Sequence, residues 1–580
     1  MTAPNVNTLW GEVIIEELAR QGVGAVCIAP GSRSTPLVMA AANHPDLEIF
    51  SHLDERSAAF FALGRAKRTG EPTPLICTSG TAAANFHPAV IEADAARAPM
   101  LILTADRPPE LRDSGANQTI DQIQLYGDAT RWYRTLPEPE AEPRKLRMLR
   151  TTVARAVSSS KRTPPGPVHL DVPFRKPLEP VETDEVSPEF ERDHPRAAAG
   201  RDGPYVRAER GRQTLDEATV ASVATAVSDA ERGLIVVGPR PAWTEDRSIV
   251  DLADATGFPL LVDPLSGLRF GPGPKTAPRC GGYDGYLHPS VTVEWPDPDI
   301  VLRVGGSPTS AVLQEYLERV DARSFLVDAG GGWEEATFTA TDLLQVDGDW
   351  LAAELAGRVS RGDQAWVDRF DQLETRYWEL LESVELPAEG AIVDTVLDQI
   401  PDGGVVFASN SMPVRDLDRF GQPRDKPLTT IGNRGASGID GITSTALGAG
   451  SEAEGDLVLL TGDLAFYHDM NGLLAIDRWD VEATIVLINN DGGGIFHMLP
   501  ISEFDPPFTE HFKTPHGLDF SPTGSLYDLQ YTRTLPADFA ESIRETFEMD
   551  GSAIIEVPTD AEDNHRERAE LADLVIEDCS

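Results

Sequence analysis

The sequence predicts an α/β protein made of three doubly wound parallel-sheet domains. Its 580 residues are too many for one hydrophobic core, and 41% of them are hydrophobic, which is typical of globular proteins. Short apolar runs alternate with helix-like segments along the whole chain. Because buried parallel strands need crossover helices between them, this alternation indicates parallel sheets.

The strand candidates fall into three blocks. The first block contains GAVCIAP, LEIFSHLD, TPLICTSG, APMLILTAD and GPVHLDVP. The second contains RGLIVVGPRP, FPLLVDP, DIVLRVGG and SFLVDAGG, and the third contains GGVVFASN, GDLVLLTGD, ATIVLINND and SAIIEVPTD. We therefore predict domains at 1–180, 214–358 and 359–580, with a proline- and acid-rich linker at 181–213.

The charge balance excludes some classes of partner. The chain has 94 acidic and 50 basic residues, a net charge of −44, so neither nucleic acid nor an anionic membrane would find a basic surface. Arginine supplies most of the positive charge. High salt screens repulsion between surface charges, so we interpret this acidic composition as adaptation to a high-salt cytoplasm and not as a sign of function.

The sequence shows no targeting or membrane segment. It begins with an amphipathic helical pattern instead of a signal peptide, and no apolar run reaches membrane-spanning length, so we expect a cytoplasmic protein. The cysteines lack metal-site spacing and are predicted to be buried thiols. They are Cys27, Cys77, Cys280 and Cys579.

Two polar motifs follow strand candidates of the third block. Asp463 ends one strand run, and Asn490 ends the next after a stretch long enough for a crossover helix and a strand. Ligands of parallel sheets bind at the carboxyl ends of strands, and the oxygens of Asp463, Asn490 and the Gly492 backbone are ligands that Mg²⁺ prefers. Either motif alone is more typical of a turn.

Longer motifs around these residues resemble the thiamine diphosphate enzymes. Within them the sequence is similar to the branch of 2-succinyl-5-enolpyruvyl-6-hydroxy-3-cyclohexene-1-carboxylate synthases of menaquinone biosynthesis. The branch is identified by GSRSTPL, HLDERSAAFFALG, TSGTAAANFHPAV, LTADRPPELRDSGANQTI, SNSMPVRDLD, GNRGASGIDG, GDLAFYHDMNGL and NNDGGGIFHMLP. Leu464 stands where most thiamine diphosphate enzymes have glycine, but leucine is usual in this branch.

The resemblance implies that the chain binds thiamine diphosphate and that two domains bind different parts of this cofactor. Residues 1–180 would bind the pyrimidine ring of thiamine diphosphate, and 359–580 would bind its diphosphate with Mg²⁺ or Mn²⁺. The first and third domains of different subunits meet at the cofactor in the family, so a homodimer or homotetramer is expected. Glu55 matches the glutamate that bonds the pyrimidine ring and acts in catalysis; without the family motifs it would be an ordinary acidic residue in a helix's first turn.

The resemblance also implies two dicarboxylate substrates, 2-oxoglutarate and isochorismate. Guanidinium groups pair with carboxylates through two parallel hydrogen bonds, whereas an isolated loop arginine is usually a solvated surface charge. The matching substrate-binding residues are Ser32, Arg33, Arg107, Gln118, Ser411, Arg415 and Arg434. Ile439, Ile495 and Phe496 match the apolar wall around the cofactor, with core packing as the alternative. His468 and His497 flank the motifs and receive no catalytic role.

The central block departs from the family. Many members carry a basic residue there that reaches a substrate carboxylate, and Ser310 and Ala311 stand near its place. Arg269 is a possible replacement, but no site residue is assigned in this block.

The implied reaction is decarboxylation of 2-oxoglutarate and 1,4-addition of the resulting succinyl-semialdehyde carbanion equivalent to isochorismate. Two alternatives remain open. Another thiamine diphosphate-dependent decarboxylase or carboligase would share the metal motif, and a non-catalytic cofactor-binding α/β protein would share the glycine-rich loops. The arginine-bearing motifs argue against the first alternative, and the absence of a GxxxxGK[ST] loop argues against simple nucleotide binding.

Overall fold

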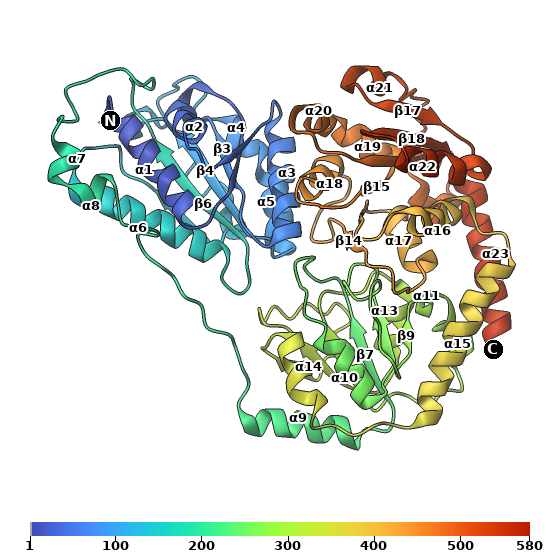
Figure 1. Ribbon diagram of the computed structural model, residues 1–580. Helices are drawn as coiled ribbons and strands as arrows, with labels where there is room; N and C mark the ends of the chain where they lie inside the picture. Colours follow the sequence, from blue (N-terminus) through green and yellow to red (C-terminus); the bar gives the residue numbers. More distant parts are fainter. Residues whose placement is uncertain (1–2) are drawn as a thin grey trace. The chain divides into compact units, whose positions relative to one another are not determined.

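The computed structural model describes residues 3–580 and contains three six-stranded sheets whose strands pair in parallel (Figure 1). It confirms the predicted fold class. The chain divides into two compact units. The first consists of the first 211 residues with Asn433–Glu452 and Asp469–Val481, and the second consists of the remainder.

The first unit contains the first sheet, with strand order β2-β1-β3-β4-β6-β5. Its strands are β1 (Ala25–Ile28), β2 (Glu48–Ser51), β3 (Pro74–Cys77), β4 (Met100–Asp106), β5 (Trp132–Thr135) and β6 (Pro167–Pro173). Its helices are α1 (Val6–Arg20), α2 (Thr35–Ala42), α3 (Glu55–Thr69), α4 (Thr81–Asn85), α5 (His87–Ala95), α6 (Pro143–Ser160), α7 (Phe190–Asp193), α8 (Pro195–Ala198), α18 (Ile442–Gly450) and α20 (Leu474–Trp479).

Two glycines let α3 and α18 pack closely in the first unit. A Cβ on Gly64 would lie 2.0 Å from the Thr445 carbonyl oxygen, and one on Gly448 would lie 2.0 Å from the Phe61 carbonyl oxygen. These distances are below any allowed contact, so both positions require glycine. The close packing makes α18, although distant in sequence, part of the first unit.

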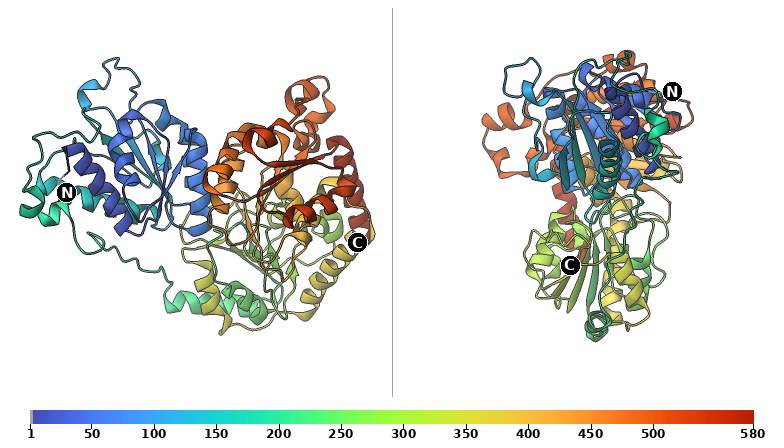
Figure 2. Two further views of the ribbon diagram at one scale, coloured as in Figure 1. Left: turned by 45° about the horizontal axis from the view of Figure 1, so that its top comes forward. Right: turned by 90° about the vertical axis from the view of Figure 1, so that its left-hand side faces the viewer.

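The second unit contains the middle sheet, with order β12-β11-β10-β7-β8-β9. Its strands are β7 (Gly233–Val237), β8 (Leu260–Val262), β9 (Arg279–Cys280), β10 (Ile300–Val304), β11 (Arg323–Val327) and β12 (Asp342–Leu344). Its helices are α9 (Glu217–Asp229), α10 (Ser248–Thr256), α11 (Tyr283–Tyr286), α12 (Pro289–Thr292), α13 (Ala311–Arg319) and α14 (Gly348–Ala356). Helices cover both faces of this sheet (Figure 2).

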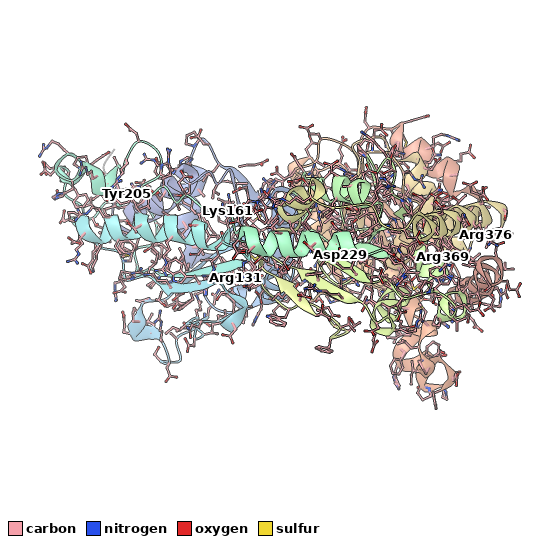
Figure 3. All side chains as sticks on the ribbon, turned by 90° about the horizontal axis from the view of Figure 1, so that it is seen from below. Arg131, Lys161, Tyr205, Asp229, Arg369 and Arg376 are labelled. Carbon is pink, nitrogen blue, oxygen red and sulfur yellow. The ribbon has the colours of Figure 1, made fainter. Side chains whose placement is uncertain are left out.

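The second unit also contains the third sheet, with order β14-β13-β15-β16-β18-β17. Its strands are β13 (Val405–Ala408), β14 (Thr429–Ile431), β15 (Leu457–Gly462), β16 (Thr484–Asn489), β17 (Gln530–Arg533) and β18 (Ala553–Pro558). Its helices are α15 (Gln364–Ser383), α16 (Ala388–Gln399), α17 (Met412–Phe420), α21 (Pro522–Tyr527), α22 (Phe539–Phe547) and α23 (Ala561–Cys579), and α19 (Asp463–Asp469) starts in this unit. Arg376 of α15, which is labelled in Figure 3, pairs with Asp578 of α23 at 3.3 Å.

The first and third sheets share one topology, and the middle sheet has another. Numbered within each domain, the first and third orders both read 2-1-3-4-6-5, whereas the middle order reads 3-2-1-4-5-6. Each order reverses direction beside its first strand, and ligands of open parallel sheets bind at such points. The reversal lies between β1 and β3, between β7 and β10, and between β13 and β15. The first and third orders reverse once more at their far edge, where β6 lies inside β5 and β18 inside β17.

Part of the segment predicted as a linker packs against the first sheet. Val186, Phe190 and Ala197 are buried in the same hydrophobic core as β6 and α6. The domain limits drawn from the sequence stay predictions, but the stretch 186–197 is anchored to the core of the first sheet. The four cysteines are buried, as predicted, and no helix among residues 3–580 is long and apolar enough to cross a membrane.

Candidate functional site

Residues from three neighbouring strands meet at the carboxyl end of the first sheet. Ser32 and Arg33 form a short 3₁₀ turn soon after β1, and Arg107 follows β4 directly. The Arg33 backbone N–H donates to the Thr78 hydroxyl at 3.1 Å, and its guanidinium donates to the Phe174 carbonyl at 2.7 Å. The first bond joins the ends of β1 and β3, where the strand order reverses.

Arg33 and Arg107 bring two positive charges together. Burial lowers the pKa of Arg33, and the charge of Arg107 lowers it further, while Asp106 opposes the shift. The Nε atom of Arg107 is buried and has no hydrogen-bond partner within residues 3–580. Adjacent guanidinium groups with an unused donor are suited to bind a carboxylate, which would relieve their repulsion.

Gln118 joins the same sheet end through the loop after β3. The Ser79 hydroxyl donates to the Gln118 carbonyl at 3.1 Å, and the Gln118 amide donates to the Ser79 carbonyl at 3.3 Å. Gln118 has a left-handed backbone with φ of 53°, which is uncommon for a residue with a side chain. The structure therefore collects the predicted residues Ser32, Arg33, Arg107 and Gln118 at one edge.

Glu55 is the first residue of α3. Its neighbour Asp54 caps the helix by accepting hydrogen bonds from the N–H groups of Arg56 and Ser57. Asp54 thus satisfies the helix end, and the half-buried Glu55 carboxylate is not needed as a cap. Its carboxylate accepts a hydrogen bond from the Asn85 amide at 3.5 Å, a long contact that leaves the carboxylate able to accept a stronger bond.

Arg434 and Ile439 belong to the loop between β14 and α18, within the first unit. The Asn433 amide donates to the Thr445 hydroxyl at 2.9 Å and ties the loop to α18. At its other end Gly441 has φ of 62°, and a Cβ there would lie 1.9 Å from the Phe60 ring. Arg434 is exposed and Ile439 half-buried, so the loop is fixed at both ends while these side chains remain accessible.

Asp463 and Gly492 are in contact at the carboxyl ends of β15 and β16, adjacent strands of the third sheet. The Gly492 N–H donates to Asp463 Oδ2 at 2.9 Å, and the Leu464 N–H donates to Oδ1 at 2.6 Å. Burial raises the pKa of Asp463, and these hydrogen bonds partly offset that. Gly492 has φ of 137°, and a Cβ there would lie 2.0 Å from the Lys513 carbonyl, so glycine is required.

Leu464 is compatible with this corner. It lies in α19 and is not among the residues with positive φ, so no glycine is needed where most thiamine diphosphate enzymes have one.

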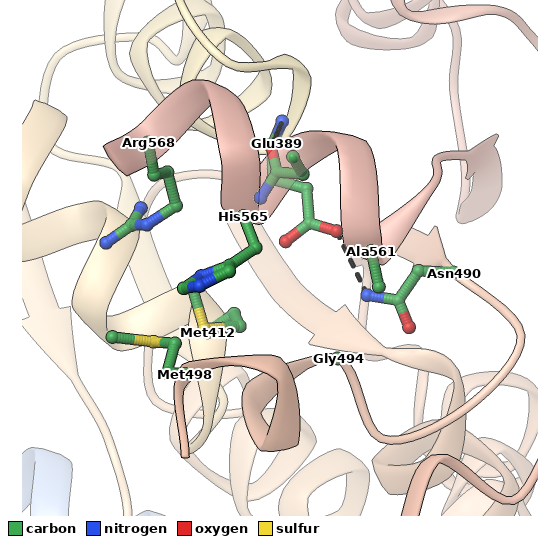
Figure 4. A pocket seen from close by; sticks show the side chains of 9 residues that line it. Glu389, Met412, Asn490, Gly494, Met498, Ala561, His565 and Arg568 are labelled. Carbon is green, nitrogen blue, oxygen red and sulfur yellow. Dashed lines mark hydrogen bonds between the residues drawn. The ribbon is translucent and has the colours of Figure 1, made fainter. Parts of the chain in front are cut away.

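Glu389 orients Asn490 from the far side. Asn490 Nδ2 donates to Glu389 Oε1 at 3.0 Å, and the Thr559 hydroxyl donates to the same oxygen at 3.0 Å (Figure 4). Burial raises the pKa of Glu389 to about 7. With its amide nitrogen held there, Asn490 has its oxygen available for another ligand. Glu389 lies a hundred residues away in sequence, so no local signal points to it.

The residues around Asp463 fit a divalent cation. No cluster of three histidine, cysteine, aspartate or glutamate side chains among residues 3–580 could hold a metal, so a site here depends on amide and carbonyl oxygens as well as one carboxylate. Asp463, Asn490 and Gly492 supply that set. His516 was missed by the sequence-based prediction; its Nε2 lies 3.2 Å from Asp463 Oδ2.

Ser411 and Arg415 lie where α17 begins, after β13. Ser411 has φ of 73°, a strained conformation for serine, and its carbonyl accepts a 2.6 Å hydrogen bond from the Arg415 guanidinium. Strained residues persist where surrounding structure enforces them, often at ligand sites. The end of β13 is also the reversal point of the third sheet.

Ile495 and Phe496 lie in a 3₁₀ turn, Gly494–Met498, after the Gly492 corner. Both are half-buried. Phe496 packs against the Phe512 ring at 5.7 Å.

Arg269 does not replace the missing basic residue of the central domain. It is fully buried and donates 2.7 Å hydrogen bonds to the carbonyls of Val262 and Gly421, and it pairs with Asp418. Its donors are used inside the protein because it holds the middle sheet to α17. Ser310 likewise has a structural role, as the cap of α13.

Three family models match consecutive parts of the chain. Residues 10–125 match the N-terminal TPP-binding domain of thiamine pyrophosphate enzymes, 200–408 match the middle domain, and 416–557 match the C-terminal TPP-binding domain. Each match contains most of one of the three sheets.

Relatives match over the whole chain. The 2-succinyl-5-enolpyruvyl-6-hydroxy-3-cyclohexene-1-carboxylate synthase of Haloarcula marismortui is 58% identical, with 100% of this chain and 99% of the relative covered. Synthases of the same name from Halobacterium salinarum and a Roseiflexus strain are 56% and 45% identical, covering 99% and 98% of this chain and 99% and 97% of the relatives. The chain therefore belongs to the 2-succinyl-5-enolpyruvyl-6-hydroxy-3-cyclohexene-1-carboxylate synthase family of thiamine diphosphate enzymes.

Proposed function

We propose that this protein joins 2-oxoglutarate to isochorismate, with loss of carbon dioxide, in menaquinone biosynthesis. The product would be the compound for which its relatives are named. The observation that carries the proposal is the contact of Asp463 with Gly492 beside Asn490, at adjacent strand ends of a TPP-binding domain. Asp463, Asn490 and Gly492 would hold Mg²⁺ or Mn²⁺ and, through it, the diphosphate.

Thiamine diphosphate, when bound, supplies a carbon nucleophile for the keto group of a 2-oxoacid and accepts the electrons released by decarboxylation. Glu55 would hold a proton between its carboxylate and the pyrimidine ring of the cofactor. Its weak contact with Asn85 leaves it able to make that bond. Ile439, Ile495 and Phe496 would cover the reacting atoms and exclude water from them.

The arginines would select dicarboxylate substrates. Arg33 and Arg107 lie together, and the repulsion between them favours an anion at the sheet end. Ser32 and Gln118 would add neutral hydrogen bonds there. Arg415 with Ser411, and Arg434, would bind further carboxylate or hydroxyl groups, so that four guanidinium groups serve the two carboxylates of each substrate.

We include a homodimer or homotetramer and a cytoplasmic location in the proposal. Glu55 belongs to the first unit and Asp463 to the second, and the family resemblance implies that such residues meet across subunits. The acidic, lysine-poor composition supports a high-salt cytoplasm. Mass measurement in high salt would decide the oligomeric state.

The test follows isochorismate consumption and carbon dioxide release by the protein in high salt with thiamine diphosphate and Mg²⁺, with and without 2-oxoglutarate. We expect isochorismate to disappear only when 2-oxoglutarate is present, and Glu55→Gln to lower turnover about 100-fold or more. Glu217→Gln is a matched control, because Glu217 also begins a helix after an aspartate cap and is exposed.

Two results would contradict the proposal. Carbon dioxide release without isochorismate consumption would identify another decarboxylase or carboligase. Cofactor binding without either change would identify a non-catalytic protein.

A further inference from the structure

A buried ion pair in the first unit supports the loop that carries Arg434. Lys67, in the last turn of α3, lies with its Nζ 3.0 Å from Oε1 of Glu92 in α5. The side chain of Glu92 is fully buried, and that of Lys67 is 9% exposed. The chain has only seven lysines, and placing one of them inside is costly unless its charge is paired.

The Glu92 carboxylate also accepts hydrogen bonds from three consecutive backbone N–H groups of the loop. Gly435 N–H donates to Oε1 at 3.1 Å, and the N–H groups of Ala436 and Ser437 donate to Oε2 at 2.6 and 2.8 Å. Successive N–H groups that converge on one anion form a backbone nest. Both oxygens of Glu92 are thus used, one by Lys67 and Gly435 and the other by the next two residues.

Gly435 makes this approach possible. A Cβ there would lie 2.8 Å from the Ala96 nitrogen and 3.0 Å from the Glu92 carbonyl oxygen, so a side chain would push the loop away from α5. Burial by itself would raise the pKa of Glu92, but Lys67 and the backbone N–H groups lower it below its ordinary value. The carboxylate therefore stays charged and accepts these bonds at neutral pH.

We infer that Glu92, neutralised by Lys67, is a positioning residue that holds residues 435–437 against α5 and so presents Arg434 and Ile439 to the substrate and cofactor. Glu92 is buried and touches neither, so it acts only through the loop. This role rests on the proposed function in one respect, because Arg434 must bind substrate for its displacement to affect turnover.

The first test is hydrogen exchange of a peptide that covers 433–441, in Glu92→Gln and in the double variant Glu92→Gln with Lys67→Met. Glutamine cannot accept all four bonds, so we expect the amides of Gly435 to Ser437 to exchange at least about tenfold faster. The double variant removes the buried ammonium as well, so it separates loss of the nest from the cost of an uncompensated charge. The loop should be released in both variants.

Glu17→Gln is the matched control. Glu17 is fully buried in the same unit, lies 3.4 Å from Arg150, and accepts a backbone N–H from Tyr205, but it holds no part of the 433–441 loop. It should leave exchange in this peptide unchanged. Equal exchange in the Glu92 and Glu17 variants would overturn the inference.

The second test is the steady-state kinetics of the same proteins. Glu92→Gln and the double variant should raise KM for the carboxylate substrate bound by Arg434 about tenfold, the effect of losing a hydrogen bond to a charged group, with a smaller change in kcat. Arg434→Ala should raise the same KM. If Arg434→Ala has no effect, the substrate role of Arg434 is wrong, while exchange still decides the role of Glu92. If Arg434→Ala raises KM and the Glu92 variants do not, the inference is wrong.

Discussion

Asp263 of the middle sheet and Asp463 of the third sheet occupy similar places but differ in their neighbouring charges. Each follows a strand directly, each is buried, and each accepts an N–H from a distant loop, from Thr309 in one case and Gly492 in the other. Arg269 lies close enough to Asp263 to favour its charged form. Within residues 3–580, the one basic side chain within salt-bridge distance of Asp463 is His516, whose Nε2 lies 3.2 Å from Oδ2.

The difference indicates which sheet end serves structure and which serves a ligand. At Asp263 the balancing positive charge is the guanidinium of Arg269, which belongs to the protein. Arg269 donates its own hydrogen bonds to groups inside the protein. The middle reversal point is also closed, because Gly238 lies so near Gly306 that a Cβ would be 1.8 Å from its carbonyl oxygen. At Asp463 no guanidinium or ammonium group of residues 3–580 pairs with the carboxylate, so a bound cation can balance its charge.

The largest expected effect is on metal binding. Asp463→Ala removes the one carboxylate of the proposed site, and we expect the affinity for Mg²⁺ in the presence of thiamine diphosphate to fall about 100-fold or more. Titration calorimetry measures this directly. An affinity within threefold of the unchanged protein would show that the metal is bound elsewhere.

Asp263→Ala should act on stability instead. It leaves the N–H groups of Leu265 and Thr309 without their acceptor inside the protein, and we expect the free energy of unfolding to fall by about 1–3 kcal/mol. Denaturant unfolding in high salt measures the loss. The affinity for Mg²⁺ should not change. A decrease comparable with that of Asp463→Ala would show that Asp263 also serves the metal site and does not have only a structural role.

Arg107→Lys tests the ligand site of the first sheet. Lysine keeps the positive charge but loses the planar fork, so we expect KM for one dicarboxylate substrate to rise about tenfold with a smaller change in kcat. The exposed Arg147 of α6 provides the control substitution Arg147→Lys. Equal KM values in the two variants would argue that Arg107 does not bind substrate.

The last expected effect is a pH dependence in the first sheet, where Asp106 and Asp171 share Arg112. Burial and then Asp106 raise the pKa of Asp171 to about 7. Between the pKa of Asp171 in the unfolded chain and about 7, the folded protein therefore keeps a proton on Asp171 that the unfolded chain has lost. The stabilisation from this proton is fully present below the unfolded pKa, and it is lost as pH rises to about 7. The slope from this group is at most about 1.4 kcal/mol per pH unit.

Asp171→Asn should remove that slope. Free energies of unfolding should be measured from pH 4.5 to 7.5. As pH rises, the stability of the variant should increase relative to that of the unchanged protein, and this difference should become constant above about pH 7. Asp229→Asn, at the exposed end of α9, controls for the loss of one negative charge (Figure 3). If the curves of unfolding free energy against pH are parallel for Asp171→Asn and the unchanged protein, the pH dependence does not come from Asp171.

All thirteen strand candidates in the sequence are strands of the structure, and the strands that were missed are all sheet edges. Edge strands pair on one side only and are partly exposed, so they lack a continuous apolar run. The missed strands are β5, β9, β12, β14 and β17. β17, for example, has the exposed sequence Gln-Tyr-Thr-Arg.

The residues of the proposed site also separate into some that could be predicted from the sequence and some that could not. Asp463 and Asn490 could be predicted because they follow apolar strand runs directly, and Arg33 because its motif GSRSTPL resembles that of the family. Glu92, Glu389 and His516 could not be predicted. Glu389 and His516 contact site residues, and Glu92 contacts the loop that carries Arg434, and only folding brings these segments together. Arg269 shows the opposite error, since its loop suggested a ligand role and its buried contacts exclude one.

The sequence by itself determined the three parallel sheets, the family and the strand-end residues, because hydrophobic periodicity and contiguous motifs are local properties of the chain. The tertiary structure decided which polar groups are satisfied inside the protein and which are left for a ligand. That distinction depends on contacts between distant segments, such as the pairing of Asp418 with Arg269 or of Glu92 with residues 435–437. Burial makes those contacts strong, and no local pattern records them.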